Sequence, residues 1–337
     1  MLHRRTLMHR AAAAPLASAL AGLPLLARAQ TAGTAAPAGW PVKPLRLIVP
    51  FPAGGTTDLL GRVLSTEMGK LLGQPMIVEN KPGAGTVVGV DATAKAAPDG
   101  YTLGCIANSF CVNQTLVKKL PYDGLRDLRP LAFLAQADHV LAAYPGSSLR
   151  NLADLIAAAR KAPGKLSYAS FGNGTSAHIS GAMLCQLAGI EMIHVPYKGQ
   201  APAMNDLMGG QVTVMFGNWP EFRHQVAAGK LVALGMATAR RITGAPDIAT
   251  LAEQGLAMES NSWFGVMTRA SVPDDIATRL SSDIGRALQT PSMQQTLQDG
   301  GMHARPGGTA EQFAEFIRSE IDKYAQVIRK ANITLEG

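Results

Sequence analysis

Two loops of this chain place glycines and hydroxyl side chains at the start of a helix-like segment, directly after a strand-like one. Glycines let backbone N–H groups turn towards one point, and the free N–H groups of a helix start carry partial positive charge. Each loop can therefore bind a small anion. A phosphate loop would need a lysine after its last glycine, which the first loop lacks, so a carboxylate fits it better than a triphosphate. The residues that we expect to contact the anion are Phe51, Ala53, Gly54, Gly55, Thr56, Thr57, Asp58, Ser170, Gly172, Asn173, Gly174, Thr175, Ser176 and His178.

Helix capping is an alternative explanation of the first loop, because Thr56, Thr57 or Asp58 would satisfy the start of the helix that follows. The second loop repeats the design of the first, with a strand, two glycines, hydroxyls and then an apolar helix stripe. Gly55 and Gly174 are 119 residues apart, which is enough to place the two loops in separate sheets. If those sheets face each other, both helix starts point at one shared ligand.

Other polar and aromatic residues stand where a strand-like segment ends, which is where binding residues gather in open parallel sheets. We include six of them among the candidates for ligand contact, although a surface or core position would explain each one equally well. They are Asn108, Ser109, Phe110, Lys198, Asn218 and Trp219.

The sequence lacks the patterns of the common catalytic and metal sites. The glycines at 83–89 resemble a dinucleotide fingerprint, but Val88 stands where the third glycine is required. No Gly-x-Ser-x-Gly elbow occurs, and Ser176 and His178, two residues apart at a helix start, do not face each other. No closely spaced histidine pair is present. We therefore expect no catalytic residue, no metal and no cofactor.

The cysteines say little about the fold or about metal binding. Cys105, Cys111 and Cys185 lack the close spacing and histidine neighbours of a zinc site. Because their number is odd, at least one thiol stays free, and the sequence leaves open whether the other two pair. We expect buried free thiols.

The candidate residues are positioned by alternating strands and helices. Apolar strand-like runs alternate with segments of helical period, which is typical of an α/β fold with mostly parallel sheets flanked by helices. The C-terminal 65 or so residues instead hold amphipathic helices at 273–289, 292–298 and 309–331, which we expect to cover an existing sheet. The strand-like runs lie at 45–51, 76–79, 101–107, 131–135, 166–170, 192–197, 212–216 and 231–237.

Composition and charge favour a globular protein without a nucleic-acid partner. Of the 337 residues, 47% are apolar and 16% are charged, an apolar share too high for a disordered chain. The formal net charge is +7, but four of the 31 basic residues and no acidic one precede Gln30. The rest therefore carries 27 basic against 24 acidic groups, too balanced for a dense basic face.

The N-terminal segment has the layout of a secretory signal peptide. A basic start precedes an apolar run at 11–26 and the small-x-small ending Ala27-Arg28-Ala29, so we predict a signal peptide at 1–29 and a flexible leader at 30–39. The alternative, a membrane anchor, is disfavoured because a run of 16 residues with two prolines falls short of the ~20 that span a bilayer. General secretion is expected over twin-arginine export, which the Arg4-Arg5 pair leaves open. The predicted location is the periplasm.

Eight strings in this order resemble the extracytoplasmic solute receptors of the tripartite tricarboxylate transporter group, also called Bug receptors. The resemblance covers nearly everything from Trp40 to the end. It implies a two-lobed periplasmic binding protein of the Venus-flytrap type, which captures a small organic carboxylate and delivers it to membrane permease subunits. The strings lie at 50–58 (PFPAGGTTD), 83–85 (GAG), 98–103 (PDGYTL), 120–123 (LPYD), 163–168 (PGKLSY), 172–175 (GNGT), 194–199 (HVPYKG) and 209–212 (GGQV).

The resemblance also implies a chain that crosses twice between its lobes, near 137–145 and 259–266. We expect lobe 1 at 40–140 plus 263–337 and lobe 2 at 141–262, in a monomer. In this family string Asp58 is a cap rather than a contact to a ligand amine. Phe110-Cys111 and the residues at 113–117 depart from the usual family pattern, so the pocket wall there is expected to differ.

Two other functions stay open at this point. A receptor that feeds a signalling partner would have the same sequence features as one that feeds a permease. An enzyme acting on a small carboxylate would need an activated nucleophile or an acid–base pair, and the sequence offers neither. The class of carboxylate, whether dicarboxylate, tricarboxylate, aromatic acid or amino acid, also stays open.

Overall fold

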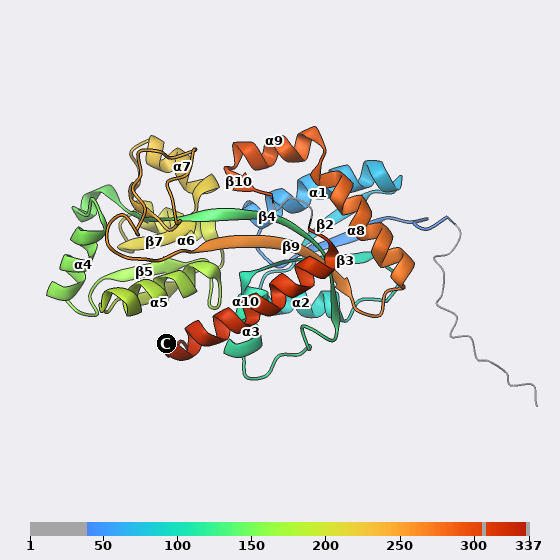
Figure 1. The fold of residues 1–337 in the computed structure, drawn as a ribbon, viewed down its shortest axis with the longest axis horizontal. Coiled ribbons are helices and arrows are strands. Elements are labelled where there is room, and N and C mark those ends of the chain that lie inside the picture. The colour runs from blue at the N-terminus through green and yellow to red at the C-terminus, as the bar shows by residue number, and fades with distance from the viewer. Residues whose placement is uncertain (1–38, 305–307, 335–337) are drawn as a thin grey trace, which may run out of the picture. The chain divides into compact units, whose positions relative to one another are not determined.

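Strands and helices alternate along the chain, as the apolar periodicity predicts (Figure 1). The computed structural model describes residues 39–304 and 308–334, so the predicted signal peptide and nearly all of the predicted leader lie outside the described residues. The strands are β1 (Leu45–Val49), β2 (Met76–Asn80), β3 (Thr102–Ala107), β4 (Leu128–Ala143), β5 (Ser167–Ser170), β6 (Ile193–Pro196), β7 (Val214–Asn218), β8 (Val232–Met236), β9 (Asn261–Arg269) and β10 (Met302–His303).

The helices follow the predicted segments and add several that the sequence did not indicate. Asn108 begins a helix instead of a loop, and two short 3-10 turns precede α2 and α4. The α-helices are α1 (Thr56–Leu72), α2 (Val87–Ala94), α3 (Asn108–Leu116), α4 (Leu152–Lys161), α5 (Ser176–Ala188), α6 (Gln200–Met208), α7 (Trp219–Ala227), α8 (Asp274–Leu288), α9 (Pro291–Asp299) and α10 (Ala310–Lys330).

The sheet is mixed, with parallel strands towards both ends and antiparallel strands between them. Its order is β2-β1-β3-β9-β4-β7-β5-β6, and β8 and β10 pair with β4. The ladders among β2, β1 and β3 and among β6, β5 and β7 are parallel, whereas β4 and β9 run antiparallel to their neighbours. The predicted mostly parallel sheets therefore correspond to these two groups of three strands. Below, the β1 half means β1, β2, β3, β9 and β10, and the β5 half means β5, β6, β7 and β8.

Strand β4 belongs to both halves of the sheet. It pairs with β9 from Leu128 to Asp138 and with β7 from His139 to Ala143, so its neighbours change between Asp138 and His139. Figure 1 shows β4 and β9 side by side across the middle of the molecule. The chain returns beside this point, where the Ser260 carbonyl accepts from the His139 backbone N–H at 3.4 Å. The assignment of two lobes stays a prediction.

The C-terminal helices pack on the β1 half. On one face, α8 and α9 join α1 in a buried cluster that includes Leu64, Leu280 and Met293. On the other face, α10 packs with α3 and β9 around Trp263, which is fully buried against Phe313. These contacts follow from the amphipathic pattern of the helices, because each helix packs its apolar face against the sheet.

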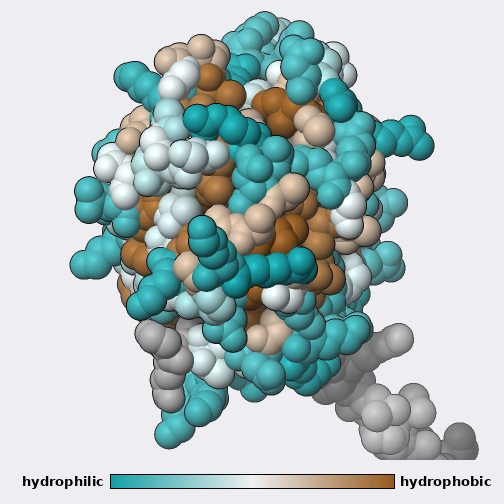
Figure 2. Space-filling model, turned by 90° about the vertical axis from the view of Figure 1, so that its left-hand side faces the viewer, coloured by the Kyte–Doolittle hydropathy of each residue, from teal (hydrophilic) through white to brown (hydrophobic). Residues whose placement is uncertain are grey.

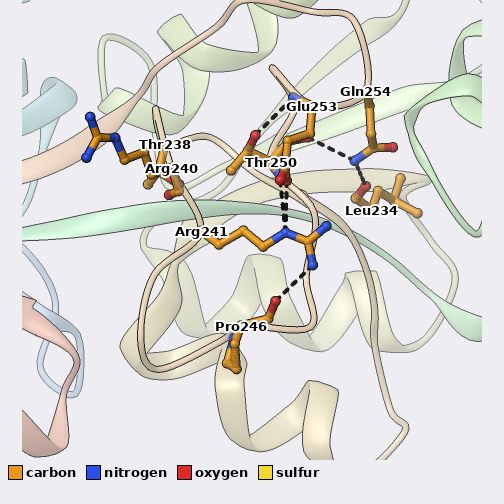
Figure 3. Close-up of polar contacts among 8 residues, drawn as sticks. All are labelled: Leu234, Thr238, Arg240, Arg241, Pro246, Thr250, Glu253 and Gln254. Atoms are coloured by element: carbon orange, nitrogen blue, oxygen red, sulfur yellow. Dashed lines mark hydrogen bonds and ion pairs between the residues drawn. The ribbon is translucent and has the colours of Figure 1, made fainter.

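The long connection from β8 to β9 has little regular structure and is held by side chains instead (Figure 3). Arg241 Nε donates to both carboxylate oxygens of Glu253 at 3.0 Å, and Arg241 Nη1 donates to the Pro246 carbonyl at 2.9 Å. Gln254 Nε2 donates to the Leu234 carbonyl at 2.8 Å, which fastens the connection to β8. A bidentate arginine–carboxylate pair fixes geometry in a way that a single bond does not.

The three cysteines are free thiols, as the sequence predicts: Cys105 and Cys111 are buried and Cys185 is half-buried. Burial raises the pKa of the Cys105 thiol to about 12. Because the thiolate is the reactive form, these positions are expected to be inert.

One face of the molecule is mainly hydrophilic. On the face shown in Figure 2, hydrophilic residues surround a few small hydrophobic areas. Within residues 39–304 and 308–334, no helix has the length and apolar character that crossing a membrane requires.

We expect Thr309→Ala to lower the free energy of unfolding by about 1 kcal/mol, because Thr309 caps α10. Its side chain accepts from the Gln312 backbone N–H at 3.3 Å, and the Gln312 side chain accepts from the Thr309 N–H at 3.1 Å. Urea denaturation measures the loss. Ser319→Ala, on the exposed side of the same helix, is the control, and an equal loss in both variants would contradict the role of the cap.

Candidate functional site

A small cavity lies between the loop that follows β1 and the loop that follows β5. Its volume is about 90 Å³, and a larger cavity of about 900 Å³ shares part of its wall, including Phe51, Phe171 and Gly199. We call them the inner and outer cavity. The inner cavity is lined by Phe51, Pro52, Ala53, Gly55, Thr56, Thr57, Ala107, Asn108, Ser109, Phe171, Thr175, Ser176, Gly199, Gln200, Ala201, Pro202, Asn218, Glu221, Ser262 and Phe264.

Asp58 fixes the first loop from within. Its Oδ2 accepts from the Gly54 backbone N–H at 3.0 Å and from Arg62 Nε at 2.9 Å, and its Oδ1 accepts from Asn80 Nδ2 at 2.9 Å. Burial on its own would raise the pKa of Asp58, but these hydrogen bonds outweigh it and hold the pKa below the ordinary value. Asp58 therefore orders the loop that precedes α1, and the start of α1 itself has no side-chain cap.

Thr56, the first residue of α1, is joined to the β5 half across the inner cavity. Its backbone N–H donates to Glu221 Oε1 at 3.0 Å, and its hydroxyl makes a short hydrogen bond to the same oxygen. Asn218 Nδ2 donates to Thr56 Oγ1 at 3.0 Å. Burial raises the pKa of Glu221, and the hydrogen bonds from Thr56 act against that shift. A carboxylate of this chain thus already contacts one backbone donor of the first loop.

The second loop orders its own backbone at the start of α5. Thr175 Oγ1 donates to the Gly172 carbonyl at 2.7 Å, and the Gly174 N–H donates to His178 Nδ1 at 3.1 Å. Ser176 Oγ lies 2.8 Å from Ser262 Oγ on β9, which ties α5 to the β1 half. Thr175 and Ser176, at the start of α5, line the inner cavity.

Two stacked histidines support this loop from behind. The rings of His178 and His194 are 3.9 Å apart between centroids, and His194 Nε2 is 2.7 Å from Ser170 Oγ. Burial lowers the pKa of His178 to about 4, and burial together with the neighbouring His178 lowers the pKa of His194 to about 3. Both rings are therefore neutral at pH 7 and position the loop without adding charge.

The structure brings thirteen of the twenty predicted contact residues to the two cavities and places the other seven elsewhere. At the inner cavity lie Phe51, Ala53, Gly55, Thr56, Thr57, Asn108, Ser109, Thr175, Ser176 and Asn218. Only the outer cavity is lined by Gly172, Asn173 and Lys198. Outside both walls, within the described residues, are Gly54, Asp58, Phe110, Ser170, Gly174, His178 and Trp219.

Phe110 and Trp219 are core residues, and helix geometry explains why. Because Asn108 begins α3, Phe110 two positions later points to the opposite side of the helix and packs in the cluster around Trp263. Trp219 begins α7 and packs with Phe222, one turn later, in the core of the β5 half.

Glu221, Gln200, Ser262 and Phe264 line the inner cavity although the sequence did not indicate them. An acidic residue in the first turn of a helix is explained by the helix dipole, so Glu221 carries no distinctive signal. Ser262 and Phe264 belong to β9, a strand that the sequence reading took for a crossing segment. Gln200 follows a quoted family string directly, which is the signal that could have found it.

Within the part of the chain that the structure describes, no group of three or more His, Cys, Asp or Glu side chains could hold a metal ion. Ser176 and His178 do not bond to each other, since Ser176 contacts Ser262 and His178 accepts from Gly174. What the site offers chemically is a set of hydroxyls, amides and helix N-termini around one carboxylate.

The chain is similar to known receptors over most of its length. Residues 60–333 match the model of the tripartite tricarboxylate transporter family receptor. Protein BugT of Bordetella pertussis is 36% identical over 313 residues, which cover 91% of this chain and 95% of BugT. The periplasmic binding protein BugD superposes with a TM-score of 0.83 at 29% identity, covering 88% of this chain and 99% of BugD. R. palustris Rpa4515 with adipate superposes equally well, with a TM-score of 0.83 at 30% identity over 88% of this chain and 99% of that one.

Proposed function

Because this chain belongs to the tripartite tricarboxylate transporter receptor family, we propose that it captures a small organic carboxylate in the periplasm and delivers it to membrane permease subunits. The fold is that of a periplasmic binding protein, and the family role is binding rather than catalysis. The adipate bound by a relative supports a carboxylate as the ligand.

The observation that carries the proposal is the convergence of two helix starts on the inner cavity. The wall takes Gly55, Thr56 and Thr57 from the start of α1 and Thr175 and Ser176 from the start of α5. Backbone N–H groups at helix starts favour a negative ligand through their partial positive charge. At the outer cavity, the loop that contains Gly85 also lies close to the second glycine loop, because a Cβ at Gly85 would lie 2.5 Å from the Asn173 carbonyl oxygen.

Binding is expected to involve closure of the two predicted lobes around the ligand, which exchanges water for fixed dipoles. Four charge-assisted hydrogen bonds at ~1.5 to 3 kcal/mol each give ~6 to 12 kcal/mol before the cost of association. A micromolar dissociation constant, which corresponds to about 8 kcal/mol, lies within that range without an arginine clamp.

A double variant, Thr175→Ala with Ser176→Ala, is expected to weaken binding at least tenfold, because it removes two hydroxyls of the cavity wall. We would first screen the mature chain by thermal shift against mono-, di- and tricarboxylates and amino acids, since a ligand that binds only the folded state raises the melting temperature. Isothermal titration calorimetry then compares the best ligand with wild type and variant. Thr66→Ala, on the exposed face of α1, is the control. Unchanged affinity in the double variant would contradict the site.

A further inference from the structure

Among the described residues, one acidic side chain and no basic one line the inner cavity. Among the described residues that line it, Glu221 alone has an ionisable side chain, and the remainder of the wall is backbone, hydroxyl, amide and apolar groups. A cavity built only for a dianion would be expected to avoid a fixed carboxylate, because like charges at close range repel. The ligand must therefore have a feature that tolerates or uses Glu221.

Two buried acceptors at this end of the cavity lack a hydrogen-bond partner. Glu221 Oε1 accepts from Thr56, but the buried Oε2 of the same carboxyl group has no partner at hydrogen-bond distance within the described chain, although the Gln200 side chain acts on Glu221 to lower its pKa. Asn218 donates to Thr56 through Nδ2, while its buried Oδ1 has no partner at hydrogen-bond distance within the described residues, although the Asn218 side chain acts on the adjacent His139 to raise its pKa. The Asn218 residue is 5% exposed, so water does not reach it freely. Buried polar atoms are nearly always paired, and a pair of orphaned acceptors indicates a missing donor.

Glu221 also lacks a counter-charge. None of the ion pairs among the described residues involves Glu221, and the two lysines of the outer cavity wall, Lys119 and Lys198, do not line the inner cavity. Gln200 Nε2 is a third buried atom without a partner, but a neutral amide supplies no charge. A carboxylate removed from water without a cation is unfavourable unless a partner supplies the missing charge.

Resting on the proposed function, we propose that the ligand is an amino carboxylate whose protonated amine binds between Glu221 Oε2 and Asn218 Oδ1. An ammonium group has three donors and one positive charge, so it satisfies both orphaned acceptors and neutralises Glu221. The carboxylate of the same molecule then lies towards the start of α5, where Thr175 and Ser176 provide donors. A dicarboxylate would instead place a second negative charge beside Glu221.

Matched pairs of ligands test this on the wild-type chain. Each pair compares a dicarboxylate with the amino acid that has the same number of methylenes: succinate with 3-aminopropanoate, glutarate with 4-aminobutyrate, and adipate with 5-aminopentanoate. The set of twenty α-amino acids completes the panel. Calorimetry is expected to find the strongest binder among the amino carboxylates, at least tenfold tighter than any of the three dicarboxylates.

Glu221→Gln then assigns the preference to one side chain. The variant keeps the shape of Glu221 and the acceptor for Thr56, but it removes the charge. We expect it to weaken the best amino carboxylate at least tenfold and to strengthen the dicarboxylates severalfold, whereas Glu191→Gln, at an exposed position, changes neither. If Glu221→Gln does not fold, the matched pairs on the wild type still decide the question.

The possible failures are distinguishable. If a dicarboxylate binds best and Glu221→Gln leaves that preference unchanged, the amine proposal is overturned while the proposed function stands. If no member of this panel binds but a mono- or tricarboxylate of the wider screen does, the amine proposal is overturned and the proposed function stands. If nothing in either set binds, both are contradicted.

Discussion

Between pH 7 and pH 5 the folded chain is expected to lose about 6 kcal/mol of stability, because three histidines that are neutral in the folded state become protonated once it unfolds. Burial lowers the pKa of His139 to about 3, that of His178 to about 4 and that of His194 to about 3. An unfolded histidine titrates near pH 6.5, so the unfolded state binds more protons throughout this window and stability falls as the pH falls. Each histidine contributes about 2 kcal/mol.

His139 is the most constrained of the three. It is fully buried, its Nδ1 is 3.0 Å from Ser260 Oγ and 3.2 Å from Ser180 Oγ, and its Nε2 is 3.0 Å from Ser262 Oγ. The neighbouring Asp138 raises the pKa of His139, but burial outweighs it. Three hydroxyls contact the neutral ring, and the Asn218 side chain also raises the pKa of His139, but burial dominates.

His303 works in the opposite direction. Its hydrogen bond to Asp138, at 2.8 Å, raises the pKa of His303. That contribution to stability is fully present below pH 6.5 and is lost as the pH rises through the higher folded pKa. The side chain of His303 is 57% exposed, so solvent screens this effect, and His139, His178 and His194, whose pKa values are lowered, dominate.

Urea denaturation at pH 7, 6 and 5 measures the predicted slope. His139→Asn should be less stable at pH 7, yet its stability should depend less steeply on pH, because one of the three groups is gone. The slope is the decisive readout, since any damaging substitution lowers absolute stability. A variant slope equal to that of the wild type would contradict the role of His139.

Asn108→Ala is expected to lower the free energy of unfolding by about 4 kcal/mol, because it leaves three buried partners unsatisfied. Asn108 Nδ2 donates to the Asn261 carbonyl at 3.1 Å and to the Tyr324 hydroxyl at 2.7 Å. Its Oδ1 accepts from the Trp263 N–H at 3.0 Å. The side chain thus joins the start of α3 to β9 and α10.

Ser109→Ala is the matched control for Asn108. Its hydroxyl pairs only with Thr86 Oγ1, at 2.9 Å, so we expect a loss of about 1 kcal/mol. Asn108→Asp should be as damaging as Asn108→Ala, because it turns a donor into a carboxylate that faces the Asn261 carbonyl. Equal losses in Asn108→Ala and Ser109→Ala, measured by urea denaturation, would contradict the anchoring role.

The sequence predicts those parts of the fold that depend on local pattern. All eight predicted strand segments are strands, and both glycine loops lead into the helices α1 and α5 at the predicted places. Strand β9 was missed because the run around Trp263 and Phe264 was taken for a crossing segment. Its role as a strand depends on pairing with β3 and β4, which are far away in the sequence.

The candidate site was predictable to the extent that it consists of loop backbone. Thr56 and Thr175 could be placed from the strand–glycine–helix pattern, which fixes where N–H groups are free. Glu221 could not be placed in this way, because its importance arises from Thr56, which is 165 residues away in the chain. Phe110 was misplaced because the helical phase of α3 could not be set while that segment was taken for a loop.

Because β4 runs through both halves of the sheet, it restricts how the molecule can adapt to ligands of different size. Two chain segments pass side by side between the halves, one at His139 and one at Ser260, and a hydrogen bond links them. If the two predicted lobes move relative to each other, we expect these two adjacent crossings to favour rotation about one axis and to resist sliding. A longer guest would accordingly be accommodated by a wider angle between the halves rather than by rebuilt walls, so a graded series of chain lengths should produce a graded series of angles.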